Sequence, residues 1–371
     1  MTNKLIYLDH AAAAPLHPAV LQAMLPYLEE PFGNPSSVHS FGRSAKNALN
    51  DARDQISSQL NCDPGELVFT SGGTESNNLA IYGAALAQQG IKKHIITSQT
   101  EHQAVLFACN HLETLGFDVT YLPVDRFGQI QISELEAAIR PDTILVSLMY
   151  GNNEVGTLQP IYQIGQLAQE KSLLFHVDAV QALGLIDLDL KSLPVHLMSF
   201  SAHKINGPKG IGALYVARKT LFAPHIRGGS QERGRRAGTE NLAGIAGFAE
   251  AVKIAVNQSA NKQHNTRIWR QMMIDIWKQE LGENGFFING HISDILPHIL
   301  NVSFPGVESE TLLMNLDLEG IAAASGSACT SGSSKMSHVL LAMRLPIDQV
   351  SSAVRFSFGL GNTTEEVQAA A

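Results

Sequence analysis

The chain has 371 residues, of which 44% are hydrophobic and 16% are charged, a composition typical of a globular protein rather than a disordered one. At about 150 residues per domain, this length predicts two to three domains. The formal net charge of −8 argues against a general nucleic-acid-binding protein, because such proteins normally carry a basic surface.

The three cysteines, Cys62, Cys109 and Cys329, stand far apart in the sequence. Their odd number and wide spacing exclude a disulfide framework and a C-x-x-C zinc site, and the histidines show no metal-ligand spacing, so we expect no metal. A reducing compartment fits this cysteine usage. Residues 1–10 lack the apolar core of a signal peptide, and the longest apolar stretch, 242–249, is too short to span a membrane. We therefore expect a cytoplasmic protein with no membrane partner.

Short apolar runs alternate with amphipathic helical patterns through the first two-thirds of the chain. The predicted strands are residues 67–70, 94–97, 119–122, 143–148, 173–177, 197–200 and 211–216. Predicted helices lie between them, at 103–115, 133–139 and 161–170. This alternation predicts an α/β fold with a mostly parallel sheet that is covered on both faces. Ligands of such sheets bind at the carboxyl ends of the strands.

The pattern changes in the last third of the chain. Residues 228–241 predict a long loop followed by a helix, and the arginines in this loop favour a solvated surface or an interface over a nucleic-acid site. Further on, strand-like runs at 300–304 and 353–358 flank a glycine- and serine-rich tract at 325–334. We predict a second, smaller α+β domain. The helix that begins at Thr364 is too short to be stable without packing.

Three polar features follow predicted strands, and each has an ordinary structural alternative. Small residues at 71–77, before a helix, offer backbone N–H groups to an anion, or form a simple turn with a helix cap. Asp178 can meet a cationic ligand group or cap a helix. Lys204 can form an imine if its amine is held partly neutral, or be a solvated loop lysine. Together, in this order, the three suit pyridoxal 5′-phosphate, which needs a phosphate cup, a carboxylate for its pyridinium nitrogen and a Schiff-base lysine.

The sequence resembles the cysteine desulfurases of the class V aminotransferase family, of PLP fold type I, along nearly its whole length. The matching segments are 7–12 (YLDHAA), 33–39 (GNPSSVH), 70–78 (TSGGTESNN), 100–102 (TEH), 152–156 (NNEVG), 176–181 (HVDAVQ), 199–215 (SFSAHKINGPKGIGALY), 235–241 (RRAGTEN), 325–332 (SGSACTSG) and 354–357 (VRFS). The resemblance implies a large PLP-binding domain over 15–260. It also implies a small domain formed by 1–14 and 261–371.

The resemblance also implies a role for each matched site residue. Lys204 would bind the cofactor covalently, Asp178 would pair with the pyridinium nitrogen, and His102 would stack on the ring and move protons. Gln181 would hydrogen-bond the ring's phenolic oxygen. The phosphate would be held by Gly73, Thr74, Ser201 and His203, and by Thr239 of the neighbouring subunit, which implies a homodimer. The substrate carboxylate would be held by Asn153 and Arg355, with Asn34 nearby.

Cys329 would accept the sulfur of L-cysteine as a persulfide, with release of L-alanine. Its tract of small and polar residues lacks the large apolar neighbours of a packed core cysteine, which favours an accessible thiol. We expect Cys62 and Cys109 to be packing residues instead. The persulfide would pass to a sulfur-acceptor protein, either an iron–sulfur scaffold or a tRNA-thiolation enzyme.

Two alternatives to a cysteine desulfurase remain open at this point. One is another class V enzyme, such as a selenocysteine lyase or an aminotransferase; Cys329 argues against simple transamination. The other is a non-catalytic interaction protein that keeps the fold, against which the intact Lys204, Asp178, His102 and Cys329 argue.

Overall fold

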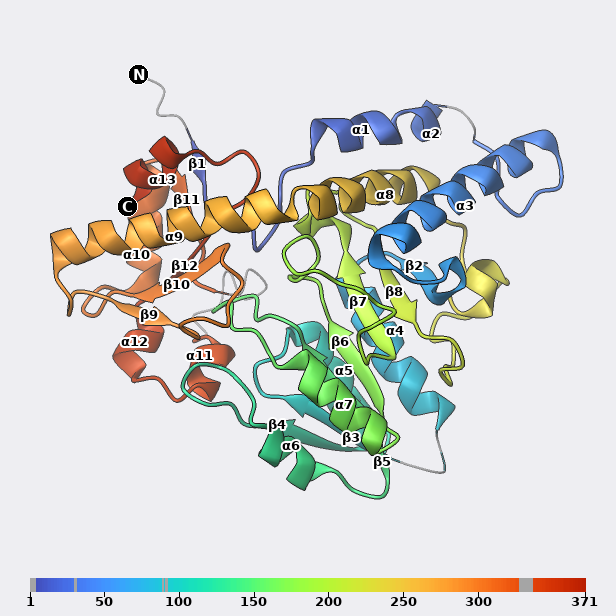
Figure 1. Cartoon of the computed structure of the whole chain (residues 1–371), viewed down its shortest axis with the longest axis horizontal. Helices are drawn as coiled ribbons and strands as arrows, with labels where there is room; N and C mark the ends of the chain where they lie inside the picture. The colour runs from blue at the N-terminus through green and yellow to red at the C-terminus, as the bar shows by residue number, and fades with distance from the viewer. Residues whose placement is uncertain (1–4, 30–31, 89, 91–92, 327–335) are drawn as a thin grey trace.

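The computed structural model describes residues 5–29, 32–88, 90, 93–326 and 336–371, and its larger sheet has seven strands. The strand order is β2-β8-β7-β6-β5-β3-β4 (Figure 1). Neighbouring strands run parallel except at β8, which is antiparallel to both β7 and β2. The bounds are β2 Leu67–Thr70, β3 His94–Ser98, β4 Asp118–Leu122, β5 Thr143–Met149, β6 Leu174–Asp178, β7 Leu197–Ser201 and β8 Gly212–Val216. The predicted mostly parallel α/β sheet is confirmed.

Both faces of this sheet are buried, because adjacent residues of one strand enter different apolar clusters. Ile95 packs in a cluster with helices α4 (Gly73–Ala87) and α5 (Gln103–Thr114). Its neighbour Ile96 packs on the other face. That face is covered by α3 (Ser40–Leu60), α6 (Ile132–Ala138), α7 (Ile161–Glu170) and α8 (Leu242–Asn257). Burial on both faces explains why these strands read as continuous apolar runs in the sequence.

A smaller antiparallel sheet, in the order β12-β10-β9, belongs to the last third of the chain. It consists of β9 Phe287–Asn289, β10 Ile299–Ser303 and β12 Ala353–Ser357. Helix α9 (Ser259–Leu281) covers it through Trp269, Met273 and Trp277. The sequence predicts β10 and β12, whereas β9 escapes prediction because two of its three residues are exposed. Further helices are α10 Ser309–Leu318, α11 His338–Ala342, α12 Ile347–Ser351 and α13 Thr364–Ala370.

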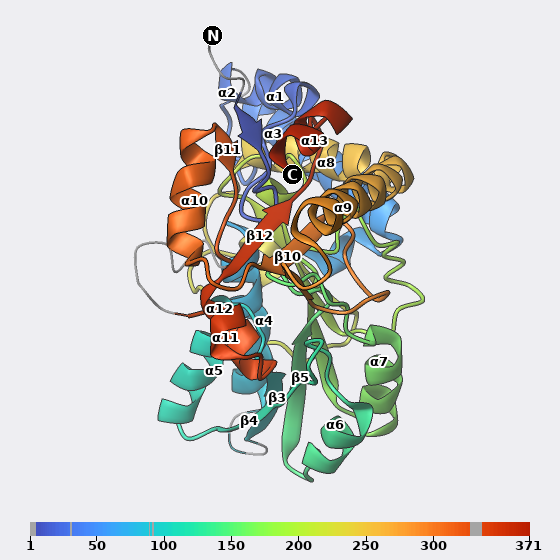
Figure 2. The ribbon, with the colours of Figure 1, turned by 90° about the vertical axis from the view of Figure 1, so that its left-hand side faces the viewer.

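The beginning of the chain joins this smaller sheet region. Strand β1 (Ile6–Tyr7) pairs in parallel with β11 (Ile321–Ala322), and Leu8 packs in the same cluster as Trp269. Figures 1 and 2 both show β1 beside the C-terminal part of the chain. The chain then crosses to α1 (Pro18–Met24) and α2 (Pro26–Glu29), beside α8. These contacts support the division into 15–260 against 1–14 with 261–371, whose bounds stay a prediction.

Packing stabilises the short C-terminal helix α13, as the sequence requires. Val367 is fully buried, and the indole N–H of Trp277 donates to the carbonyl oxygen of Ala371 at 2.8 Å. A capping box between Thr363 and Glu366 satisfies the first backbone N–H groups. Among the helices described, none has both the length and the apolar character needed to cross a membrane.

Candidate active site

A cavity of about 480 Å³ lies at the carboxyl ends of β5, β6 and β7. Its wall brings together most of the residues that the sequence singles out. These are Gly73, Thr74, His102, Asn153, Asp178, Gln181, Ser201, His203, Lys204 and Arg355. The carboxyl ends of neighbouring parallel strands meet at one edge of a sheet, which is why segments far apart in the sequence converge here.

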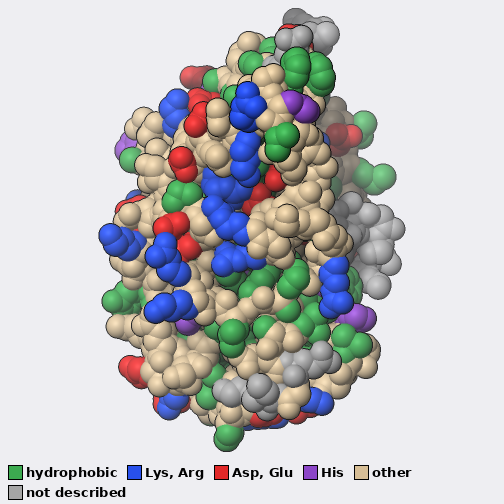
Figure 3. Space-filling view, turned by 90° about the vertical axis from the view of Figure 1, so that its right-hand side faces the viewer, with side chains coloured by type: hydrophobic (Ala, Val, Ile, Leu, Met, Phe, Trp, Pro, Cys, Tyr) green, Lys and Arg blue, Asp and Glu red, His purple; other side chains and the backbone are tan. Residues whose placement is uncertain are grey.

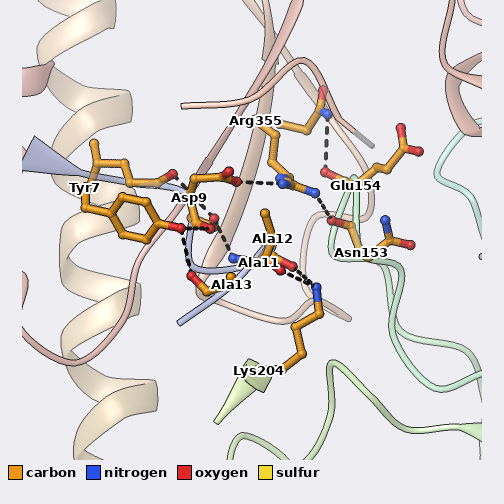
Figure 4. Close-up of polar contacts among 12 residues, drawn as sticks. Tyr7, Asp9, Ala11, Ala12, Ala13, Asn153, Glu154, Lys204 and Arg355 are labelled. Carbon is orange, nitrogen blue, oxygen red and sulfur yellow. Dashed lines mark hydrogen bonds and ion pairs between the residues drawn. The ribbon is translucent and has the colours of Figure 1, made fainter. Parts of the chain in front are cut away.

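Lys204 stands at the end of a short 3-10 turn, Ala202–Lys204, which directly follows β7. Its Nζ donates hydrogen bonds to the carbonyl oxygens of Ala11 at 2.5 Å and of Ala12 at 2.8 Å (Figure 4). The Ala11 carbonyl also accepts a hydrogen bond from Nε2 of Gln181 at 2.9 Å. The N-terminal segment therefore forms one wall of the cavity and holds the lysine amine there.

Asp178 ends strand β6 and is 7% exposed. Its Oδ2 accepts a hydrogen bond from Nδ2 of Asn77 at 2.6 Å, and its Oδ1 accepts one from the backbone N–H of Val180 at 3.0 Å. These two donors hold the carboxylate in a fixed orientation. Asn77 belongs to the run 71–77 that the sequence offers as an anion site, but its contact with Asp178, 101 positions away, is not predicted.

The start of α4 forms a cradle of small residues against β7. Gly72 caps the helix with φ +148°, and a Cβ on Gly73 would lie 2.7 Å from Cγ2 of Val180. The helix N-terminus carries a partial positive charge that favours an anion. Opposite it, Ser201 Oγ and His203 Nδ1 are hydrogen-bonded at 2.8 Å.

His203 and Lys209 complete this end of the cavity. Burial, together with the positive charges of Lys204 and Lys209, lowers the pKa of His203 to about 4. His203 is therefore neutral at pH 7. Lys209 lines the cavity but has no role in the sequence analysis, because it lies on a loop before β8 rather than directly after a strand.

His102 caps helix α5, with its Nδ1 accepting a hydrogen bond from the backbone N–H of Ala104 at 3.1 Å. Burial lowers the pKa of His102, and nearby Asp178 opposes that shift. The ring is therefore neutral at pH 7, with its proton on Nε2 because Nδ1 is an acceptor.

Arg355 lies on β12 and is 1% exposed. Its guanidinium donates to Oδ1 of Asp9 at 2.7 Å and to the carbonyl oxygen of Asn153 at 2.8 Å (Figure 4). Its Nε has no partner among the described residues. In the sequence, Asp9 stands out only as part of the matching segment 7–12. Its pairing with Arg355 depends on the contact between β1 and the smaller sheet.

Two predicted residues stand apart from this cavity, and a third is not described. Asn34 and Thr239 are exposed and do not line it within one subunit, so their roles stay predictions. Cys329 lies outside the described residues. Of the other cysteines, Cys109 is buried and Cys62 packs against the main core, as expected for packing residues.

The arginines before Thr239 are held by local partners. Arg236 pairs with Glu75 at 2.8 Å, and Arg235 donates to the carbonyl oxygen of Gly65 at 3.2 Å. On the face that Figure 3 presents, Lys and Arg side chains gather in a band with Asp and Glu beside them. This mixed charge agrees with a solvated surface or an interface.

Pyridoxal 5′-phosphate fits the donor set of the cavity. A lysine amine, a buried carboxylate with two donors of its own and a helix N-terminus with no side chain at Gly73 meet the cofactor's aldehyde, pyridinium nitrogen and phosphate. Lys204, Asp178 and the Gly73–Thr74 turn would hold these three groups.

Comparisons with known proteins agree with this site. Residues 6–370 match the family model "Aminotransferase class-V". The chain is 49% identical over 367 residues to the "Putative cysteine desulfurase IscS 1" of Bacillus subtilis, covering 99% of this chain and 96% of that protein. It is 46% identical over 362 residues to the "Cysteine desulfurase IscS" of Dictyoglomus turgidum, covering 98% and 91%.

Solved structures give the same result. The solved structure of a NifS-like protein superposes with a TM-score of 0.93 at 37% identity, covering 99% of this chain and 97% of that one. The structure of SspA in complex with cysteine superposes with a TM-score of 0.84 at 38% identity, covering 95% and 98%. The chain therefore belongs to the pyridoxal phosphate-dependent class-V aminotransferase family, and within it to the group of the cysteine desulfurases.

Proposed function

We propose that this protein is a cysteine desulfurase in which Cys329 receives the sulfur of L-cysteine. The observation that carries the proposal is the convergence of Lys204, Asp178 and Arg355 on one cavity. Each is a group that a cofactor-bound amino acid needs: an amine to exchange, a counter-ion for the ring, and a cation for the substrate carboxylate.

Arg355 and Asn153 orient the substrate in this proposal. The guanidinium is held from two sides by Asp9 and by the Asn153 carbonyl, so it presents its remaining N–H groups in a fixed direction. Arg355 is almost fully buried, and burial strengthens its attraction for a carboxylate. The substrate Cα is thereby placed on the lysine side of the cavity.

Lys204 or His102 takes the proton from the substrate Cα. Pyridoxal phosphate, when bound, supplies the electron sink that makes this proton removable. Burial keeps the pKa of His102 low, so its ring is uncharged at pH 7, but its Nδ1 already accepts the Ala104 N–H and its Nε2 carries the proton. Lys204 is therefore the better placed of the two bases.

The sulfur transfer balances without an external oxidant or reductant. The electron pair of the Cys329 thiolate forms a bond to the substrate sulfur while the Cβ–S bond breaks. The electron pair of the broken Cβ–S bond stays on the carbon side, where protonation gives alanine. The sum is L-cysteine plus one thiol giving L-alanine plus one persulfide.

We further propose that the protein works as a homodimer, with Thr239 reaching the phosphate of the other subunit's cofactor. The persulfide would then pass to an acceptor protein of iron–sulfur cluster assembly or tRNA thiolation. Thr239 is exposed in the single chain, which leaves it available to a second subunit.

Replacement of Cys329 by serine tests the proposed function. The variant is expected to keep the absorbance of the bound cofactor and its change on adding cysteine, but to lose alanine and persulfide formation. Cys62→Ser is the matched control, since Cys62 packs against the core away from the cavity. Normal alanine production by Cys329→Ser would overturn the role of Cys329. A wild-type protein that binds cofactor but turns over selenocysteine and not cysteine would instead favour a selenocysteine lyase.

A further inference from the structure

Glu154 is a buried acid next to the substrate-binding residues, but it faces another way. Its side chain points away from Lys204 and Arg355 (Figure 4), and it does not line the cavity. The residue is 1% exposed, and its Oε2 accepts a hydrogen bond from Oγ of Ser337 at 2.5 Å. Its Oε1 has no partner among the described residues. A buried carboxylate is costly unless its partners compensate for the lost water, so this position calls for a physical reason.

A second contact of Glu154 is with Gly326. A Cβ at Gly326 would lie 2.7 Å from Oε2 of Glu154, and the residue has φ +121°, a region that favours glycine. Only glycine therefore allows the backbone to approach the carboxylate this closely. Gly326 directly precedes residues 327–335, and Ser337 follows them after one residue. One carboxylate oxygen thus contacts a described residue on each side of the segment that contains Cys329.

The same region is tied to the substrate arginine. The backbone groups of Ala324 and Arg355 exchange two hydrogen bonds, at 3.1 and 2.6 Å. The Arg355 guanidinium donates to the carbonyl oxygen of Asn153, the residue before Glu154. On the other side, Ser337 caps helix α11, and His338 is hydrogen-bonded to the carbonyl oxygen of Glu101 at 2.9 Å, beside His102.

We propose that Glu154 is a positioning residue for sulfur transfer. Its side chain fixes Gly326 and Ser337 relative to the substrate-binding residues Asn153 and Arg355. The proposal rests on the proposed function, because it matters only if Cys329 is the sulfur acceptor. Cys329 follows Gly326 by three residues, a reach of at most about 11 Å of chain. A shift of Gly326 therefore changes where the thiol can meet the substrate sulfur, without changing how the substrate is bound.

The test compares four single variants and one double variant of the cofactor-loaded enzyme. Glu154→Ala removes both contacts, whereas Glu154→Gln keeps a side chain that can hydrogen-bond Ser337. Ser337→Gly removes the hydroxyl with little loss of helix capping, since glycine is itself a fair cap. Thr363→Gly changes another capping hydroxyl, that of α13, and is the matched control.

We expect Glu154→Ala and Ser337→Gly to lower kcat for alanine formation at least about tenfold, since a misplacement of about 1 Å can cost on the order of 100-fold. Their KM for cysteine and the change in cofactor absorbance on adding cysteine stay within about twofold of wild type. Glu154→Gln and Thr363→Gly keep near-normal kcat. The double variant of Glu154→Ala with Ser337→Gly is no slower than Glu154→Ala alone.

Three results would decide against the proposal or its basis. Wild-type kcat in both Glu154→Ala and Ser337→Gly overturns the positioning role. A parallel loss of kcat, cysteine binding and melting temperature in both variants overturns it too, because that pattern indicates a structural role. If Glu154→Ala does not fold, Ser337→Gly alone decides. A wild-type enzyme that forms neither alanine nor persulfide contradicts the proposed function, an outcome distinguishable from these.

Discussion

Asn77 shows how a residue with no obvious chemistry supports one that has it. Its Nδ2 lies 2.6 Å from Oδ2 of Asp178, and both side chains are buried. Removing one donor leaves a buried carboxylate oxygen without its partner, which costs free energy. The proposed pairing of Asp178 with the pyridinium nitrogen therefore depends on Asn77 as well.

Replacing Asn77 by alanine is expected to weaken cofactor binding about tenfold or more, because a hydrogen bond to a charged group contributes about 1.5–3 kcal/mol. Titration of the apoenzyme with pyridoxal phosphate, followed by absorbance, measures the effect. Asn78→Ala is the control on the same helix, since Asn78 donates to the carbonyl oxygens of Thr74 and Ala104 rather than to Asp178. Equal affinity in the Asn77 variant and the wild type would contradict this support role.

At the scale of elements, α13 depends on its cap and on the packing of the last residues of the chain. The Thr363 hydroxyl accepts the backbone N–H of Glu366 at 3.2 Å, and the Glu366 carboxylate accepts the N–H of Thr363 at 3.3 Å. A helix of this length is not stable alone, so the cap and the contacts of Val367 and Trp277 decide whether it forms.

We expect Thr363→Ala to lower the free energy of unfolding by about 1 kcal/mol, the usual contribution of a capping hydroxyl. Thr363→Ser keeps the hydroxyl and should behave like wild type. Urea unfolding of both variants, followed by tryptophan fluorescence, measures the difference. Equal midpoints for alanine and serine would show that the cap contributes nothing here.

At the scale of the whole molecule, buried neutral histidines make stability depend on pH. His176 lies inside β6, where its ring nitrogens are hydrogen-bonded to Ser147 at 2.8 Å and to Ser199 at 2.9 Å. Burial lowers the pKa of His176 from 6.5 to about 3, and that of His10 to about 4. Between pH 6.5, the pKa in the unfolded chain, and these lower folded-state values, the unfolded chain binds protons that the folded chain does not. The free energy of unfolding is therefore greatest above pH 6.5 and falls as the pH falls.

His176→Gln is expected to flatten this dependence by up to about 1.4 kcal/mol per pH unit between pH 6 and 4, the contribution of one proton. Urea unfolding at several pH values gives the slope for each protein. The slope, rather than the absolute stability, is compared, because the substitution also changes packing. The exposed His264→Gln variant is the control, and a slope in His176→Gln equal to that of wild type would contradict the assignment.

The fold and the positions after its strands could be predicted from the sequence because both are local properties. Apolar runs of four to seven residues mark strands buried on both faces, and the residue after such a run lies at the edge where ligands bind. Asp178 and Lys204 are found in this way, and both line the cavity. Strand β9 escapes because two of its three residues are exposed, so it shows no such apolar run.

Only the tertiary structure decided which segments far apart in the chain contact one another. Asp9 meets Arg355 across 346 positions, Asn77 meets Asp178 across 101, and Glu154 meets Ser337 across 183. No local pattern encodes such pairs, since they arise from strand pairing and from helices packing on a common sheet. The sequence by itself determined the α/β class and the chemistry of the cavity. The structure decided which neighbours hold that chemistry in place, because burial and hydrogen bonding depend on the whole packed chain.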